Sequence, residues 1–436
     1  SGISYAYTAS VGPIRQSDEL TAGYLHNCVI KLGMVYCWGY NAYGQLGDGT
    51  TTNSSVIPSV PVKTSTGEYL KDVVSISAGT STTCALTISG AGYCWGYNQY
   101  GQLGDGTTTS RSVATPVTTT TVANGSVSFS SGVTAIAVGT HQTCAVKNGA
   151  VYCWGYGGNG NIGDGTTTNK LVPTPSLILT SGVTQINSQD QTICAIKAGA
   201  LYCWGYNAYG QLVDGTTTSK STPAVISQMS SGVTDVDLGF YNVCAIKNGA
   251  AFCWGYNYNY VLGDGTATNR TVPTPVASSV SGVAFDSQVV DVTVSDHHDP
   301  SHACAIKQDG KAYCWGDNTY GQLGDLTTTA SSRPVFATGF SGKVSATAMT
   351  YTTTCMIVDG AVKCVGYNAQ GQVGNGNTTN TTTPFGPAAL TNGIGSFDVL
   401  PTAGPATITG YVGTGETLTG ATVLDPLTGT WKGFSA

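Results

Sequence analysis

The sequence predicts an all-β protein: a seven-bladed β-propeller with one disulfide-linked hairpin in each blade and extended β segments at both ends. Three observations lead to this expectation. The 14 cysteines fall as seven close pairs, the surroundings of each pair recur every 50 to 60 residues, and only 9% of the 436 residues are charged while 59 are glycine. A repeated unit of this composition favours many short strands joined by turns over long helices.

The charge of the chain argues against several classes of partner. Its formal net charge is -6, and its 17 lysines and arginines are scattered singly. The chain therefore offers no basic surface for nucleic acid or for an anionic bilayer. No run of about 18 apolar residues could span a membrane. The chain begins at Ser1 without a methionine, as a secreted protein does after its signal peptide is removed.

The third cysteine pair illustrates the predicted hairpin. Asn148-Gly149 is a strong signal for a two-residue type I′ turn, because both positions of that turn need a positive φ. Counting outward from the turn places Cys144 opposite Cys153 at a non-hydrogen-bonded position, where Cα atoms approach to roughly 4.5 Å. That separation lies within the range that a disulfide can bridge.

The same arithmetic applies to all seven pairs, with hairpins one residue longer in the second and sixth repeats. It predicts seven disulfides, Cys28–Cys37, Cys84–Cys94, Cys144–Cys153, Cys194–Cys203, Cys244–Cys253, Cys304–Cys314 and Cys355–Cys364. Reduced cysteines buried in the core are the alternative. Because disulfides persist in oxidising compartments, we expect an extracellular or cell-surface protein.

Each repeat contains four candidate strands. In the fifth repeat these are a leading strand at 233–239, the two arms of the cysteine hairpin, and a proline-bearing strand at 271–276. Both faces of the hairpin are apolar, as a blade packed between two neighbours requires. Four-stranded units that repeat radially and are buried on both faces describe a propeller.

The motif W-G-x-N-x-x-G-Q-L-G, present at 38–47, 95–104 and 315–324, resembles the repeat of the regulator of chromosome condensation family. The resemblance covers about residues 17–400 and implies a seven-bladed propeller. The third and fifth repeats depart from the motif, Val213 replaces a glycine in the fourth, and Val365 replaces the tryptophan in the seventh. The family's nucleotide exchange on a nuclear GTPase is not expected, because paired cysteines do not suit that compartment. Secreted bacterial relatives that use one propeller face to bind protein are the better functional analogue.

Nothing in the sequence forms a catalytic constellation, so we expect no enzyme activity and no cofactor. Tyrosines that follow the Trp-Gly step are the candidate binding face: Tyr43, Tyr100, Tyr209, Tyr258, Tyr260 and Tyr320. If the loops share one face, these rigid amphipathic side chains suit contact with protein or glycan. The alternative is that the first tyrosine of each loop packs into the neighbouring blade.

Three histidines gather in the segment SDHHDPSHAC before the sixth hairpin: His297, His298 and His302. We expect a solvated loop here, and a divalent metal site is the alternative. The aspartate that recurs once in each of six repeats is too sparse for calcium, and a turn explains it. Sequons permit N-glycosylation at Asn53, Asn124, Asn269, Asn377 and Asn380.

The two ends extend beyond the propeller. We expect an N-terminal arm at 1–16, the propeller at 17–400 and a C-terminal β segment at 401–436. The last segment resembles the opening strands of immunoglobulin-like repeats in bacterial surface proteins, but 36 residues are too few for a sandwich. Unpaired strands there favour a structural or adhesive building block that assembles with itself into a surface filament. A solitary secreted binder or inhibitor of a surface protein or glycan, and a fragment of a larger surface protein, are the alternatives.

Overall fold

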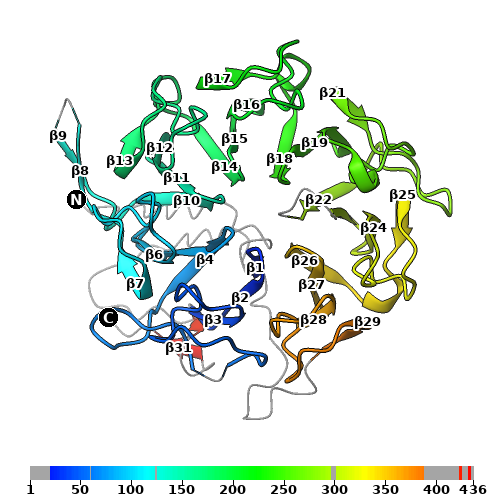
Figure 1. The fold of residues 1–436 in the computed structure, drawn as a ribbon, viewed down its shortest axis with the longest axis horizontal. Coiled ribbons are helices and arrows are strands. Elements are labelled where there is room, and N and C mark those ends of the chain that lie inside the picture. Colours follow the sequence, from blue (N-terminus) through cyan, green and yellow to red (C-terminus); the bar gives the residue numbers. More distant parts are fainter. Residues whose placement is uncertain are drawn as a thin grey trace, which may run out of the picture. The chain divides into compact units, whose positions relative to one another are not determined.

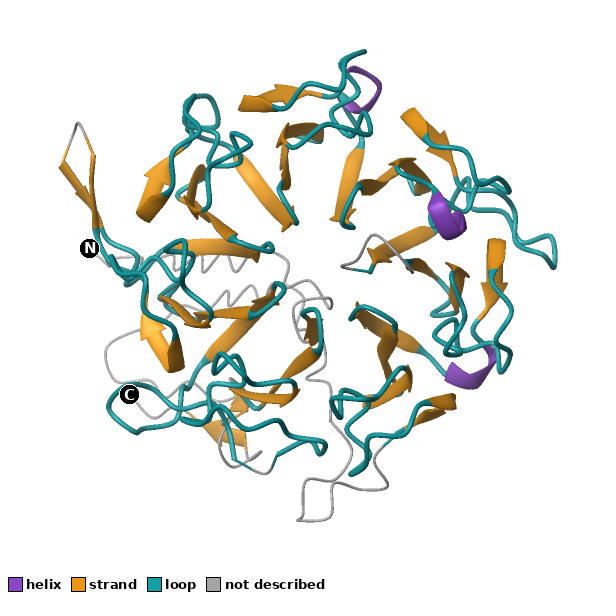
Figure 2. Ribbon diagram, viewed as in Figure 1, coloured by secondary structure: helices purple, strands orange, loops and turns teal. Residues whose placement is uncertain are grey.

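The structure, a computed structural model, describes residues 20–58, 60–122, 125–295, 301–386, 422–424 and 431–433. The chain divides into two compact units: Gln16–Phe397, and the two ends of the chain, Ser1–Arg15 with Asp398–Ala436. The first unit is a ring of seven antiparallel sheets (Figures 1 and 2). The predicted all-β, seven-bladed propeller is therefore confirmed.

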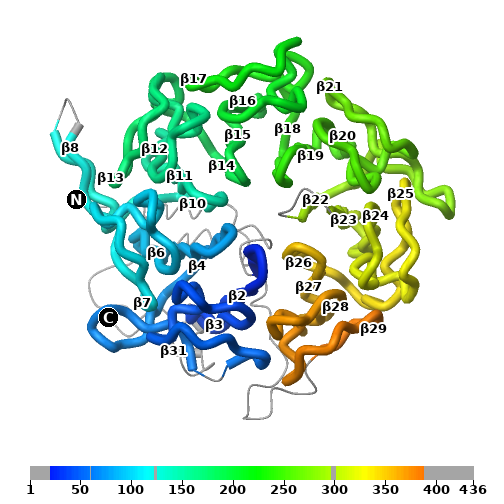
Figure 3. Tube along the Cα trace, viewed as in Figure 1, coloured from blue at the N-terminus to red at the C-terminus, as the bar shows by residue number. Residues whose placement is uncertain are grey.

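The blades follow one another in sequence order around the ring (Figure 3). Their strands are β1 (Leu20–Ala22), β2 (His26–Lys31) and β3 (Met34–Gly39) in the first blade; β4 (Val73–Ala78), β5 (Thr82–Thr87), β6 (Gly92–Gly96) and β7 (Arg111–Pro116) in the second; β10 (Val133–Val138), β11 (Gln142–Lys147), β12 (Ala150–Gly155) and β13 (Lys170–Pro175) in the third; and β14 (Val183–Gln189), β15 (Thr192–Lys197), β16 (Ala200–Gly205) and β17 (Lys220–Val225) in the fourth.

The remaining blades have the same order. They contain β18 (Val233–Leu238), β19 (Asn242–Lys247), β20 (Ala250–Gly255) and β21 (Arg270–Pro275); β22 (Val289–Val294), β23 (His302–Lys307), β24 (Ala312–Gly316) and β25 (Ser331–Phe336); and β26 (Val344–Met349), β27 (Thr353–Val358), β28 (Ala361–Gly366) and β29 (Thr381–Phe385). Two separate hairpins pair β8 (Thr120–Val122) with β9 (Gly125–Val127) and β30 (Thr422–Leu424) with β31 (Trp431–Gly433). Short 3-10 turns occupy Ser227–Met229, Tyr258–Tyr260 and Thr338–Phe340.

Each blade contains one disulfide between its two central strands. In the third blade Cys144 pairs with Cys153 in register, and the turn residues Asn148 and Gly149 have φ values of 51° and 77°, as a type I′ turn requires. All seven predicted pairs are bonded, with Cα atoms 4.0 to 4.2 Å apart. In the chain-entropy description each bond closes a loop of about ten residues and stabilises the fold by about 2 to 3 kcal/mol.

The first blade corrects the expectation of four strands in every repeat. Its sheet has three strands, and the segment that follows is joined to it by an isolated bridge between Gly39 and Ser54 and a hydrogen bond from Val62 N to Val35 O. The same segment reaches the seventh blade through a bridge between Val56 and Asn375. Among the described residues, no strand is exchanged between the first and seventh blades. Instead the first blade contacts the seventh through main-chain bonds, of which Tyr351 N to Tyr24 O is one.

Neighbouring blades are joined by the indole of the motif tryptophan. Trp154 Nε1 donates to Gln102 O of the preceding blade over 2.9 Å, and Trp38, Trp95, Trp204, Trp254 and Trp315 make the equivalent bond. All six rings are fully buried. Because Trp38 donates to Gln372 of the seventh blade, the same contact also closes the ring.

Glycines make room for these indoles. A Cβ on Gly104 would lie 2.7 Å from Trp154 Nε1, so any larger residue there would displace the ring. The seventh blade has Val365 instead of tryptophan, and at its boundary with the sixth the ring of Phe340 lies against the equivalent glycine, Gly324. The carbonyl of Gln322 then accepts from Thr354 Oγ1. At this boundary the ring of Phe340 therefore fills the space beside the glycine, and Thr354 supplies the hydrogen bond to the carbonyl.

Two tryptophans differ in what their loss would leave behind. Gln102 O also accepts from Thr143 Oγ1 over 2.8 Å, whereas Asn161 O accepts from Trp204 Nε1 and has no second donor among the described residues. We expect Trp204→Phe to lower the free energy of unfolding by about 1 to 2 kcal/mol more than Trp154→Phe, because only the first change leaves a buried carbonyl oxygen without a hydrogen-bond donor. Urea denaturation of both variants measures the difference, and equal losses would show that the indole contributes through packing alone.

Candidate functional site

Topology brings the candidate residues to one face of the propeller. The turns of the cysteine hairpins lie at one end of each antiparallel blade, so the connections between its first and second strands and between its third and fourth strands lie at the other. We call this second end the loop face. Each of its long loops begins at the Trp-Gly step, which is Val365-Gly366 in the seventh blade.

A buried asparagine holds six of the seven long loops in shape, and the third blade has Gly157 at this position. In the second blade Asn98 Oδ1 accepts from Leu103 N over 2.9 Å, while Nδ2 donates to the carbonyl oxygens of Thr107 and Thr109, each 3.1 Å away. Asn41, Asn207, Asn257, Asn318 and Asn368 make the same contacts. These loops are thus held by internal hydrogen bonds and present their remaining side chains on a fixed backbone.

The recurring aspartate belongs to the same loop structure. Asp105 Oδ1 accepts from Thr107 N and Thr107 Oγ1, and Oδ2 pairs with Arg111 over 2.9 Å. Burial acts to raise the pKa of Asp105, but the hydrogen bonds from Thr107 and Arg111 outweigh burial and lower the pKa. The carboxylate therefore closes a turn, as the Asp-Gly spacing indicates.

Aromatic side chains from adjacent blades meet across the loop face. Tyr43 lies against Tyr97 of the next blade with ring centroids 4.8 Å apart, and Tyr209 lies against Tyr256 at the same distance. Such contacts form three groups of rings, which together we call the aromatic belt: Tyr43, Tyr97, Tyr100, His141 and Tyr156; Tyr206, Tyr209, Tyr241, Tyr256 and Tyr258; and Tyr24, Tyr320, Tyr351 and Tyr367.

The six tyrosines singled out from the sequence differ in exposure. Tyr43, Tyr258 and Tyr260 are exposed by 42%, 53% and 36%, whereas Tyr100, Tyr209 and Tyr320 are half-buried because each packs on a ring of the next blade. Tyrosines of one loop thus pack against rings of the neighbouring blade and still reach the surface. The packing between blades that was the alternative expectation is present, and the use of these tyrosines in binding stays a prediction.

Sequence reasoning missed four members of the belt: Tyr24, His141, Tyr241 and Tyr351. They come from the short connection between the first and second strands, where they precede the cysteine arm. His141 lies 4.8 Å from Tyr100, and Tyr241 lies 4.7 Å from Tyr209, between ring centroids. The signal that could have found them is an aromatic residue one to three positions before the second strand.

The belt also contains a buried acid. Asp190 is 3% exposed and has a φ of 41°. Burial raises its pKa to about 7, against the opposing effect of hydrogen bonds to Gln191. Burial, followed by Tyr209 and the nearby Asp190, raises the pKa of Tyr206. The acid therefore lies close to this part of the belt.

The expected histidine loop needs a correction at His302. This residue is the first of β23 and is fully buried, so it is not part of a solvated loop. His302 Nε2 lies 2.7 Å from Thr354 Oγ1, which itself donates to Gln322 O, so Nε2 must carry the proton. His297 and His298 lie outside the described residues, and no group of three potential metal ligands occurs among the residues that are described.

His26 occupies the equivalent position in the first blade and bonds Thr83 Oγ1 over 2.9 Å. Within the described residues, Nδ1 of His26 and of His302 lacks a hydrogen-bond partner. Burial lowers the pKa of both side chains to about 3. These histidines are neutral core residues that join neighbouring blades.

The candidate glycosylation sites lie in the long loops. Asn53, Asn269, Asn377 and Asn380 are exposed, and Asn124 lies outside the described residues. Asn53 Oδ1 accepts from Asn41 N, and Asn53 Nδ2 donates to Gln370 Oε1 over 2.7 Å. Glycosylation at these sites stays a prediction.

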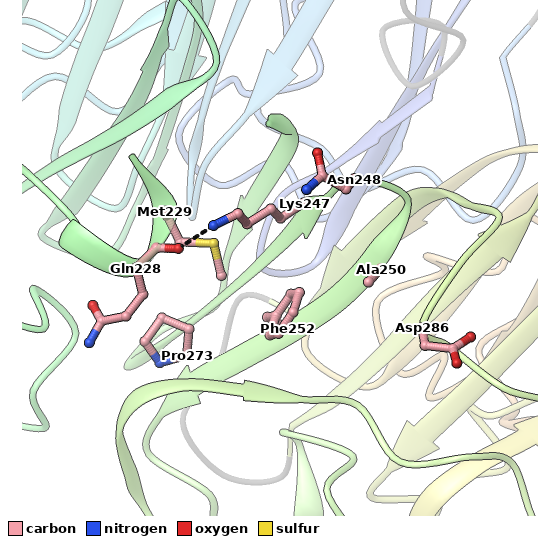
Figure 4. A pocket seen from close by; sticks show the side chains of 8 residues that line it. All are labelled: Gln228, Met229, Lys247, Asn248, Ala250, Phe252, Pro273 and Asp286. Atoms are coloured by element: carbon pink, nitrogen blue, oxygen red, sulfur yellow. Dashed lines mark hydrogen bonds between the residues drawn. The ribbon is translucent and has the colours of Figure 1, made fainter. Parts of the chain in front are cut away.

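A hollow of about 340 Å³ lies at the turn end of the fifth blade, away from the belt (Figure 4). It is lined by Gln228, Met229, Lys247, Asn248, Ala250, Phe252, Pro273 and Asp286. Lys247 Nζ already donates to Gln228 O over 2.6 Å. The lining residues include no serine, cysteine or histidine.

The fold is a seven-bladed propeller whose long loops are gathered on one face. The RCC1-like domain pattern matches residues 8–300, and the regulator of chromosome condensation (RCC1) repeat matches 289–322 and 309–357. The chain belongs to this family. The matches stop before 401–436, so the resemblance of that segment to immunoglobulin-like repeats stays an expectation. Within the described residues no helix is long and apolar enough to cross a membrane.

The human probable E3 ubiquitin-protein ligase HERC4 is 32% identical over 165 residues, which are 36% of this chain and 14% of the ligase. The ultraviolet-B receptor UVR8 of Arabidopsis thaliana is 35% identical over 141 residues, or 32% of this chain and 29% of the receptor. The aligned residues span less than a third of either relative. The likeness is therefore one of propeller repeats.

Two solved structures share the fold. Human WBSCR16 superimposes with a TM-score of 0.62 at 22% identity, over 76% of this chain and 84% of that one. Prp20p of Saccharomyces cerevisiae, whose binding to Gsp1p and histones has been examined, gives 0.64 at 17% identity, over 85% and 87%. RCC1-like propellers thus include binders of proteins.

The buried histidines predict a specific dependence of stability on pH. Each is neutral in the folded protein down to about pH 3 but takes up a proton below about pH 6.5 when unfolded. Their contribution to stability is thus complete above pH 6.5 and is lost as the pH falls toward 3. At pH 5 the loss is about 2 kcal/mol for each histidine.

We expect the double variant His26→Gln/His302→Gln to lose less stability between pH 7 and pH 5 than the parent. Glutamine occupies this position in the third blade as Gln142, and its amide can donate to the same threonine. Urea denaturation at both pH values measures the effect, and identical pH profiles would contradict it.

Proposed function

We propose that this protein is an extracellular, non-enzymatic binding protein and that the aromatic belt is the surface that contacts its partner. The observation that carries the proposal is the belt itself, a set of tyrosines held on rigid loops and shared between blades. Tyrosine supplies a large contact area at a low cost in side-chain entropy, and its hydroxyl can bond a polar partner.

The compartment is inferred from the disulfides. Seven cross-strand disulfides suit an oxidising environment and would not persist in a reducing one. A binding role agrees with a family whose members include binders of proteins, and the partner of this chain is a surface protein or glycan.

The charges of the loop face restrict the partner further. The described loops contain no lysine or arginine, and the cations that begin the fourth strands are each paired with an aspartate of the same loop: Arg111, Lys170, Lys220 and Arg270. An anionic partner would therefore find no free counter-charge. The face suits a neutral partner that can pack on tyrosine.

The double variant Tyr43→Ala/Tyr258→Ala tests the belt, because both side chains are exposed and their loss should leave the fold intact. Labelled parent protein should be retained on the surface of the cells that produce it, and the variant should be retained about tenfold less. Tyr69→Ala is the matched control, since Tyr69 is 42% exposed outside the belt. Equal retention of all three proteins would refute the proposal.

A structural building block is the second candidate function. The observation favouring it is that the ends of the chain form a compact unit of their own, in which β30 pairs only with β31 among the described residues. A two-stranded hairpin is marginally stable by itself, and strand addition to a second copy would stabilise it.

Deletion of residues 401–436 tests this candidate. If the ends join subunits, the parent should form oligomers or filaments and the truncated protein should be a monomer with an intact propeller. Light scattering after size exclusion measures the masses, and far-ultraviolet circular dichroism checks the fold. A monomeric parent, or a truncated protein that assembles as the parent does, would exclude the building block.

A further inference from the structure

Among the described residues, the aromatic belt is interrupted at two blade boundaries, between the third and fourth blades and between the fifth and sixth. Only at the first of these does the following loop begin with a tyrosine, Tyr206. At four other boundaries a tyrosine of one loop lies on the first tyrosine of the next: Tyr43–Tyr97, Tyr100–Tyr156, Tyr209–Tyr256 and Tyr320–Tyr367, with ring centroids 4.8 to 5.3 Å apart. In the third blade the corresponding position is Asn159. No tyrosine of the third-blade loop therefore packs on the ring of Tyr206 in the fourth blade.

The loop of the third blade is also the one with the least side-chain volume. Gly157 and Gly158 precede Asn159, and a Cβ on Gly158 would lie 2.1 Å from the hydroxyl of Tyr156. Tyr156 thus lies over Gly158, within its own loop. Tyr206 packs against Tyr241 at 5.4 Å, and among the described residues no second ring covers it.

Polar groups border the uncovered ring. Asn159 Nδ2 donates to Gln191 Oε1, and Gln191 O accepts from Tyr206 N over 2.9 Å. Gln191 follows the buried Asp190 in the chain, and Asp190 is close enough to Tyr206 to add to the rise that burial causes in the pKa of that tyrosine. A tyrosine ring, two amides and a carboxyl, contributed by two blades, thus meet at one place on the loop face.

The charges near this place select the class of ligand. Asp190 has no cationic partner among the groups that determine its pKa, and Lys170 and Lys220, which begin the fourth strands of the two blades, are paired with Asp164 and Asp214. An anion would meet no free positive charge. A ligand must instead offer a weakly polar face to the ring and several hydroxyls to the amides and the carboxyl.

A pyranose ring has both properties. The C–H bonds on one face of the sugar carry partial positive charge and match the negative face of an aromatic ring, while its hydroxyls both donate and accept. We propose that the boundary of the third and fourth blades is a subsite for a pyranose residue of a neutral glycan, with Tyr206 as the stacking platform and Asp190, Gln191 and Asn159 as the hydroxyl-binding groups. This proposal rests on the aromatic belt being the binding surface.

The decisive variant is Asn159→Tyr. It introduces the residue that four other loops have at this position, and the new ring would cover Tyr206. Tyr206→Ala removes the platform, Tyr206→Phe keeps it, and Tyr69→Ala is the control outside the belt.

Affinity electrophoresis in gels containing laminarin, mannan or dextran measures binding to free neutral polysaccharide, and alginate is the anionic comparison. We expect at least one neutral polysaccharide to retard the parent, and alginate not to. Asn159→Tyr and Tyr206→Ala should weaken that binding by about tenfold or more, while Tyr206→Phe and Tyr69→Ala bind within about threefold of the parent. Ribonuclease B against unglycosylated ribonuclease A tests a protein-linked glycan in the same way.

Three results would overturn the subsite: no retardation by any neutral glycan, equal binding by Asn159→Tyr and the parent, or a preference for alginate or oligolysine. If neutral glycans fail to bind while Tyr43→Ala/Tyr258→Ala still lowers retention on cells, the subsite is wrong and the belt as a protein-binding surface stands. If retention is also unchanged, both proposals fail.

Discussion

The hydrogen bond from each tryptophan indole to a carbonyl of the preceding blade is the contact on which the ring and its loop face depend. It joins the strand that begins a long loop to the long loop of the preceding blade, so it sets the position of one loop relative to the next. The tyrosine pairs follow from that spacing. Where tryptophan is missing, in the seventh blade, Phe340 and Thr354 preserve the packing and the hydrogen bond separately.

Rigidity of the loop face is what makes it suitable for binding. Asn98 and its counterparts satisfy the main-chain groups of a long, irregular loop from within, and the adjacent aspartate closes the following turn. Because these groups are already ordered before a partner arrives, binding costs little conformational entropy. The binding function proposed for the belt therefore depends on buried polar side chains below the surface.

The local features of the fold were predictable from sequence because they depend on neighbours in the chain. The Asn148-Gly149 turn determines the register of its hairpin, and the register places Cys144 opposite Cys153. The same reasoning failed where long-range packing decides. His302 belongs to a strand because its ring bonds Thr354 of the next blade, a residue that no local pattern connects with it. The three-stranded first blade likewise depends on the contact with the seventh.

The candidate site likewise divides into features that the sequence predicted and features that only the tertiary structure revealed. Sequence alone identified the loop tyrosines, the disulfides and the lack of a basic surface, because composition, spacing and turn chemistry are properties of short segments. Only the tertiary structure decided which rings meet: it added His141 and Tyr241 to the belt and revealed that Asn159 leaves Tyr206 uncovered beside Asp190. The physical reason is that these contacts join different blades, whose spacing is set by buried indoles and glycines far from the surface that they arrange.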